Sequence, residues 1–303
     1  MSGASGPGVF CNGEWVERSN AQVSAFDAGV QHGVGLFETM LGVTDAEGAR
    51  IIGLREHAER LATSARELRL SEDLDVESLG DAALEAVRRS GHARARVRLT
   101  VTGGDLNLLQ ARGETNAEPT LLIDAQPATA YPDAMFDKGV LAGIAGSKAN
   151  PLDPTASHKT LNYWWRLREL QVAAGRGAGE ALVFDVTNHL AGGCVSNAIA
   201  IKGEVAMTPI VRGEERPGGV PSPVLPGVTR SMALGWLEDA GLEVQRRMIT
   251  VDDVLDADEL VLTNSGFGVL PVVRVEARAI GTGEPGAVTR GLIERWHGAV
   301  GLD

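Results

Sequence analysis

The apolar residues of this chain occur in short runs, and this feature restricts its fold most strongly. No run exceeds about eight residues, whereas a helix that spans a bilayer needs about 20. Residues 95–102 alternate apolar and polar side chains, as a half-buried strand does, and apolar residues from Leu54 to Leu68 recur at helical spacing. The two periods follow one another along the chain, which predicts a soluble α+β protein.

The expected elements follow from these periods and from turn residues. The Asn12-Gly13 pair between apolar flanks predicts a hairpin over residues 9–16. We expect further strands at 95–102, 120–124, 140–144, 180–185, 197–202 and 258–263. We expect helices at 54–68, 81–89 and 161–174, one that opens at Gly227, and one after Pro285-Gly286.

A stretch with two prolines and little apolar pattern, residues 125–133, is expected to link two domains. The length of 303 residues agrees with two domains. The first would cover residues 1–124 and the second residues 134–303.

The charge balance restricts the partners. The formal net charge is −12, from 28 basic and 40 acidic residues, so neither a nucleic acid nor an anionic membrane would attract the chain. Cys11 and Cys194 form no CxxC pair, and the six histidines lack HxxxH or HExxH spacing, so no metal site is expected. The first eight residues carry no apolar signal segment, and we expect a cytoplasmic protein.

Lys159 is the first candidate for chemistry, because the chain has only four lysines. It precedes Thr-Leu-Asn-Tyr-Trp-Trp, and an amine that is desolvated beside aromatic rings loses proton affinity, as an imine-forming lysine must. The alternative is a lysine that extends to solvent from the start of a helix. The segment alone leaves both interpretations open.

Two segments could bind phosphate. Gly227 leads into a helix whose first amides, at Val228 and Thr229, have no internal partner and point toward any anion. Ser265 lies in a glycine-containing loop directly after an apolar strand. Both segments could equally be ordinary structural turns.

Two arginines could bind anions as well. Arg60 flanks the apolar stripe of its helix, and Arg98 alternates with apolar residues on its strand, where it could grip a carboxylate. Arg94 and Arg96 share the face of Arg98, so a solvated face is an alternative.

Several motifs, taken in order, resemble the class IV aminotransferases, the fold-type IV pyridoxal-phosphate (PLP) enzymes. This family includes branched-chain and D-amino-acid aminotransferases and aminodeoxychorismate lyase. The resemblance runs from about Phe10 to Val300. The motifs that carry it are 26–39, 56–61 with Ser64, 158–163 (His-Lys-Thr-Leu-Asn-Tyr), 190–197, 225–230 (Leu-Pro-Gly-Val-Thr-Arg), 257–259 and 263–265.

The resemblance implies a fold and a set of roles. The fold would be α+β, with a small first domain, a larger second domain with a barrel-like sheet, PLP between them, and a homodimer as the assembly. Lys159 would carry PLP as a Schiff base and move the substrate proton. The implied cofactor-binding residues are Arg60, Tyr163, Gly192, Ser196, Asn197, Gly227, Val228, Thr229 and Ser265. Arg98 and His32 would contact the substrate, a small amino or keto acid.

The chain departs from the family pattern where Gly192 replaces a glutamate that pairs with the pyridine nitrogen of PLP. Without that carboxylate the ring should be a weaker electron sink, and a Gly192→Glu change should raise transamination if the pocket has room. Asp185 is the first residue to check for a substitute carboxylate. Three functions follow from this: a PLP-dependent aminotransferase, a lyase of the same fold, or a non-catalytic PLP- or metabolite-binding protein.

Overall fold

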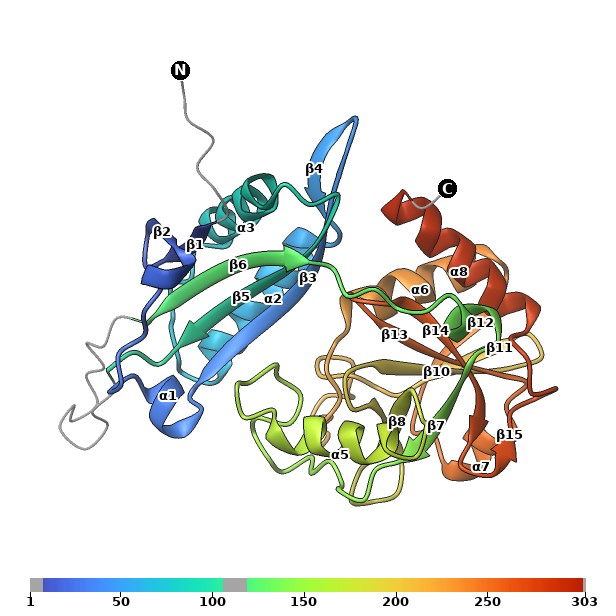
Figure 1. Ribbon diagram of the computed structural model, residues 1–303. Coiled ribbons are helices and arrows are strands. Elements are labelled where there is room, and N and C mark those ends of the chain that lie inside the picture. Colours follow the sequence, from blue (N-terminus) through green and yellow to red (C-terminus); the bar gives the residue numbers. More distant parts are fainter. Residues whose placement is uncertain (1–7, 106–118, 302–303) are drawn as a thin grey trace. The chain divides into compact units, whose positions relative to one another are not determined.

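A computed structural model describes residues 8–105 and 119–301 of the chain (Figure 1). The chain forms two compact units. Unit 1 contains residues 1–129 and 158–163, and unit 2 contains residues 130–157 and 164–303. Each unit is described by itself.

Unit 1 is built on an antiparallel sheet. Its described strands have the order β2-β1-β6-β5-β3-β4. Their bounds are β1 Gly8–Cys11, β2 Glu14–Glu17, β3 Gly35–Asp45, β4 Gly48–Ile51, β5 Arg94–Thr102 and β6 Leu121–Pro127. Asn12 and Gly13, with φ of 50° and 94°, form the two-residue turn of the predicted hairpin. Strand β6 includes residues 125–127, which the sequence had suggested for the linker.

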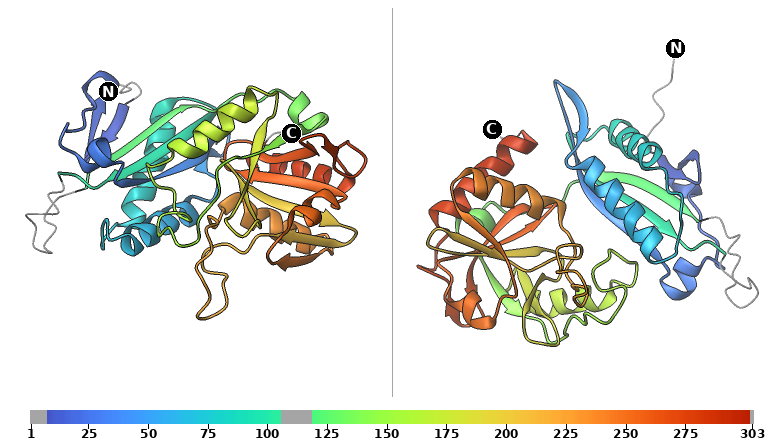
Figure 2. Two further views of the ribbon diagram at one scale, coloured as in Figure 1. Left: turned by 90° about the horizontal axis from the view of Figure 1, so that it is seen from below. Right: turned by 180° about the vertical axis from the view of Figure 1, so that it is seen from behind.

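One face of this sheet is covered by two helices, α2 Leu54–Glu67 and α3 Val76–Ser90 (Figure 2, right). The core between them includes Leu36, Met40, Leu61 and Val87. Helix α3 begins before the expected residue 81 because the Asp75 side chain accepts hydrogen bonds from the amides of Glu77 and Ser78. A short helix α1, Ala28–His32, and a 3₁₀ turn, Arg18–Asn20, complete the described part of this unit.

Residues 158–163 belong to unit 1, although they follow the first connection into unit 2. The amide of Phe37 donates to the carbonyl of Lys159 at 2.8 Å, and the amide of Leu161 donates to the carbonyl of Gly35 at 2.9 Å. The segment therefore runs as a short extended edge beside β3. The expected helix start at residue 161 is wrong: the helix begins at Trp164, because Leu161 is held in this pairing.

Unit 2 contains a curled mixed sheet with the described order β12-β11-β10-β13-β14-β7-β8-β9, and β15 pairs with β14. The strands are β7 Val140–Ile144, β8 Glu180–Phe184, β9 Leu190–Gly193, β10 Asn197–Lys202, β11 Val205–Thr208, β12 Glu243–Arg246, β13 Glu259–Asn264, β14 Gly268–Val275 and β15 Arg278–Ala279. The helices are α4 Ala134–Asp137, α5 Trp164–Ala174, α6 Val228–Asp239, α7 Val251–Leu255 and α8 Ala287–Val300.

The sheet of unit 2 buries a large aliphatic core that includes Leu182, Leu260, Leu262 and Leu270. Helices α6 and α8 pack against β13. The predicted α+β fold with a barrel-like second sheet is confirmed. None of the described helices combines the length and the apolar character needed to cross a membrane.

Candidate active site

Lys159 is held in place by the segment that pairs with β3. Neighbouring residues on an extended segment point to opposite faces. His158 points toward α2, where its Nδ1 lies 2.9 Å from Ser64 Oγ. Lys159 therefore lies on the face of the sheet that α2 does not cover, together with Phe37.

Two aromatic rings lie beside the Lys159 amine. Its Nζ lies 4.5 Å from the centre of the Phe37 ring and 5.5 Å from that of Tyr163. The two rings meet edge to face at 5.3 Å. Arg98 completes the group, with its guanidinium carbon 3.5 Å from the centre of the Phe37 ring. Lys159, Tyr163 and Arg98, which the sequence singled out separately, thus come together around Phe37.

Arg98 is a partly buried cation. Burial lowers its pKa to about 10, so it stays charged at neutral pH. Its Nε donates to Thr100 Oγ1 at 3.3 Å, and the carboxylate of Asp124, which lies opposite Arg98 on β6, partly offsets the effect of burial on this pKa. A partly buried guanidinium of this kind suits a carboxylate ligand.

Arg60 projects from helix α2 and forms a cluster with His57 of the same helix and Glu38 of β3. Its Nε and Nη2 donate to the two oxygens of Glu38 at 2.9 and 2.6 Å. His57 Nδ1 lies 2.7 Å from Glu38 Oε2. Sequence patterns assigned no role to Glu38 or His57, because Glu38 lies 19 residues from His57 and 22 from Arg60 in the chain.

In unit 2 the start of helix α6 provides amides for an anion. Gly227 precedes the helix, and no described side chain caps the first turn. A Cβ at Gly227 would lie 1.9 Å from Asn197 Oδ1, so only glycine lets the chain pass so close. Thr229 Oγ1 lies 3.4 Å from Ser265 Oγ. Gly227, Val228, Thr229, Ser265 and Asn197 are therefore assembled around one helix start.

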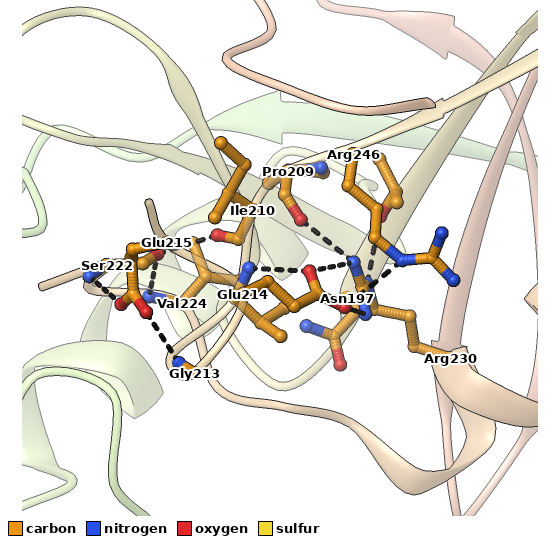
Figure 3. A network of polar contacts seen from close by, with 12 residues as sticks. Asn197, Pro209, Ile210, Gly213, Glu214, Glu215, Ser222, Val224, Arg230 and Arg246 are labelled. Atoms are coloured by element: carbon orange, nitrogen blue, oxygen red, sulfur yellow. Dashed lines mark hydrogen bonds and ion pairs between the residues drawn. The ribbon is translucent and has the colours of Figure 1, made fainter. Parts of the chain in front are cut away.

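Arg230, in the first turn of α6, connects this turn to the segment before it through its guanidinium (Figure 3). Its guanidinium donates to Thr208 Oγ1 at 3.0 Å, to the Pro209 carbonyl at 3.1 Å and to both oxygens of Glu214 at 3.0 and 2.9 Å. Glu215 in turn accepts from the amides of Gly213 and Ser222 (Figure 3). These contacts fix the loop before α6.

Gly192 leaves no space for a side chain. Its φ is +112°, and a Cβ there would lie 2.7 Å from the Ser196 carbonyl oxygen. The Gly192→Glu prediction required room for a side chain at residue 192, and the structure has none. The Ser196 carbonyl oxygen occupies the space into which a glutamate side chain would extend.

The turn at residues 193–196 follows Gly192 and is held from three sides. Glu180 accepts from the amides of Cys194 and Val195 and from Ser196 Oγ. Arg166 donates to the carbonyls of Gly193 and Cys194. Asn264 Nδ2 donates to the carbonyl of Val195 at 3.2 Å. This set of contacts was not visible in the sequence.

Asp185 and Cys194 are explained by local structure. Asp185 Oδ1 accepts from the amides of Thr187 and His189 and from the Thr187 hydroxyl, so it shapes its own turn. Burial raises the pKa of the Cys194 thiol to about 12, which agrees with a small buried residue and not a nucleophile.

His32 is exposed at the end of α1.

The residues present fit PLP by their chemistry. An amine beside aromatic rings can form an imine, and an uncapped helix start with two hydroxyls can bind phosphate. Gly227 lets the Asn197 side chain lie against this helix start, because any Cβ at residue 227 would collide with it. The site residues fall in both units: Lys159, Tyr163, Arg60, Arg98 and His32 in unit 1, and Gly192, Ser196, Asn197, Gly227, Val228, Thr229 and Ser265 in unit 2.

Comparison with known proteins identifies the family. The model of the class IV amino-transferases matches residues 35–275, so the chain belongs to that family of PLP enzymes, as its motifs predicted.

Individual relatives include branched-chain-amino-acid aminotransferases. A Methanocaldococcus jannaschii protein provisionally named as one is 29% identical over 95% of this chain and 94% of its own. The Salmonella typhimurium branched-chain-amino-acid aminotransferase is 26% identical over 96% and 92%. A branched-chain amino acid aminotransferase from T.th., solved with pyridoxamine 5′-phosphate, aligns at a TM-score of 0.87 with 26% identity, covering 99% of this chain and 96% of its own.

Proposed function

We propose that this protein is a PLP-dependent aminotransferase that moves an amino group between an amino acid and a 2-oxo acid. The observation that carries the proposal is the placement of the Lys159 amine beside Phe37 and Tyr163, with the partly buried Arg98 on the same face. Bound PLP would supply the carbonyl that accepts the amino group and the ring that withdraws electrons.

The residues of the chain then have separate tasks. Lys159 holds the cofactor covalently and afterwards takes and returns the proton at the substrate α-carbon. The amides of Val228 and Thr229, the Ser265 hydroxyl and Arg60 bind the phosphate. Tyr163, Ser196 and Asn197 contact the ring, and Arg98, with His32 as a second candidate, orients the substrate carboxylate.

An absorbance spectrum of the purified protein with PLP tests the first step. Borohydride reduction should fix the chromophore onto Lys159, and peptide mapping should find the label there and not on Lys148 or Lys202. Lys159→Ala should lose the reducible chromophore and all turnover, while Lys148→Ala keeps both. A label on another lysine, or no label in the presence of PLP, would refute the assignment.

A lyase of the same fold is the second candidate, and Gly192 favours it. A ring without a carboxylate partner withdraws electrons less strongly, and an elimination tolerates that better than a full transamination. Incubation with amino donors and 2-oxo acids separates the two. Appearance of the new amino acid supports the aminotransferase; loss of donor without amino transfer supports the lyase. A bound chromophore without turnover on any donor would indicate a binding protein.

We also propose that the protein acts as a homodimer, an expectation that rests on the family resemblance. Light scattering coupled to size-exclusion chromatography measures this directly, and a mass equal to that of one 31.8-kDa chain would contradict it.

A further inference from the structure

Glu38 is a buried carboxylate to which the proposed function gives no task. It lies in β3, whose neighbouring residues Leu36, Phe37 and Met40 are buried and apolar, and its own side chain is 2% exposed. Burial of an ionised carboxylate is strongly unfavourable unless charged partners compensate it. The protein therefore tolerates a cost at this position that an apolar residue would avoid.

The partners of Glu38 come from one face of helix α2. His57 and Arg60 are three residues apart, so both project from the same side of the helix toward β3. Arg60 places two nitrogens on the two carboxylate oxygens, at 2.9 and 2.6 Å. Such a two-point contact fixes the plane of a guanidinium and not merely its distance.

Stability alone does not account for this arrangement. A buried ion pair is often no more stable than apolar residues of the same volume, because desolvation cancels most of the attraction. Asp27, the comparable buried carboxylate of unit 1, receives only neutral donors among the described residues: the Gly29 amide and the hydroxyls of Thr102 and Thr120. Glu38 differs from Asp27 because it binds a charged donor, Arg60, which is itself expected to bind the phosphate of PLP.

We propose that Glu38 is a positioning residue, which holds the guanidinium of Arg60 in the one orientation that binds the phosphate of PLP. The inference rests on the proposed function. A free arginine side chain has high rotamer entropy. When a partner restricts the side chain before the ligand binds, less conformational entropy is lost on binding, and the affinity is higher. The carboxylate also offsets part of the Arg60 charge, which weakens the attraction of Arg60 for phosphate. The affinity gained from the fixed orientation must therefore exceed the affinity lost through the reduced charge.

The test compares PLP with pyridoxal, which forms the same bond to Lys159 but has no phosphate. Affinities are measured by absorbance titration of the full-length protein. In Glu38→Gln one carboxylate oxygen becomes an amide that faces the Arg60 donors, and the affinity for PLP should fall about 10- to 50-fold. The affinity for pyridoxal should change less than about threefold, because the phosphate contact is absent. Glu38→Asp keeps the charge but shortens the reach, so it should show the same selective loss if Glu38→Gln folds poorly.

Asp27→Asn provides the matched control, since it also neutralises a buried carboxylate of unit 1 and should change both affinities by the same factor. In the Glu38→Gln/Arg60→Ala double variant the loss should not exceed that of Arg60→Ala alone. Equal losses for PLP and pyridoxal in both Glu38 variants, or tighter PLP binding, would overturn the positioning role. If the unchanged protein forms no chromophore with either compound, the proposed function fails instead.

Discussion

Gly192 shows how one backbone angle can decide whether a functional side chain fits. Its φ of +112° lies in a region that residues with a Cβ rarely adopt, and the Ser196 carbonyl closes the remaining space. The sequence showed that the usual glutamate is missing. Only the structure shows that this position does not admit a side chain.

We predict that Gly192→Ala destabilises the protein more than Gly48→Ala does. Gly48 has almost the same φ, +115°, but no atom of the described residues lies within 4 Å of a Cβ built on it. Gly48→Ala should therefore cost about 1–2 kcal/mol from the backbone alone. Gly192→Ala should add about 1–3 kcal/mol for the contact with Ser196. Urea unfolding of both variants measures the difference, and equal losses would show that the turn simply moves away.

The charge state of Glu38 gives a second prediction at this scale. Burial raises its pKa, but the charges and hydrogen bonds of Arg60 and His57 outweigh burial and lower the pKa to about 2. A lowered folded-state pKa stabilises the protein above the usual glutamate pKa, and this contribution is lost as the pH falls toward 2. Between pH 5 and pH 3 the free energy of unfolding should fall more in the unchanged protein than in Glu38→Gln, by on the order of 2 kcal/mol. Parallel pH curves for the two proteins would contradict this.

The turn at residues 193–196 illustrates the scale of the element. Glu180 of β8, Arg166 of α5 and Asn264 of β13 come from separate parts of unit 2 and bind the same four residues. The local sequence Gly-Cys-Val-Ser predicts only a turn. Its fixed shape depends on side chains that lie at least 14 residues away in the chain.

We predict that Glu180→Gln loosens this turn. Because the glutamine amide would face another donor, either the Cys194 amide or the Ser196 hydroxyl loses its acceptor, at a cost of about 1–3 kcal/mol. Amide hydrogen exchange at Cys194 and Val195 should become faster. Glu169→Gln is the matched control: it should affect Gly146, whose amide donates to Glu169, and leave 194 and 195 unchanged. Unchanged exchange at 194 and 195 in Glu180→Gln would refute this account.

Burial also raises the pKa of Glu180, so its effect on stability has the opposite sign to that of Glu38. Its contribution to stability should decrease as the pH rises above the usual glutamate pKa, because the folded state resists ionisation of this group. Glu180→Gln should remove that part of the pH dependence, which the same unfolding measurements record.

For the whole molecule, the sequence predicted local elements better than it predicted which distant segments pair with one another. The hairpin around Asn12-Gly13 and the strands β5, β7 and β10 were predicted because their periods and turn residues are local. Residues 158–163 were not recognised as an extended edge, because their pairing with β3 spans more than 120 residues of chain. In the same way, Lys159, Tyr163 and Arg98 were candidates, but Phe37, which joins them, was not.

We predict that the edge formed by residues 158–163 protects β3. The Phe37 amide should exchange slowly in the unchanged protein, because it donates to Lys159. Leu161→Pro removes the amide that donates to Gly35 and should accelerate exchange at Phe37. Exchange at Val97, in the neighbouring strand β5, should stay slow and serves as the internal control. Fast exchange at Phe37 in the unchanged protein would contradict the pairing.

The return of the chain to unit 1 at residues 158–163 also sets the order of events during synthesis. A ribosome adds about 5–20 residues per second, so the first 129 residues emerge seconds before the segment that completes their sheet. In that interval the edge of β3 is open to pairing with other nascent chains. The segment that contains Lys159 closes this edge, so the residue expected to bind the cofactor lies in the last part of the chain that unit 1 needs to complete its sheet.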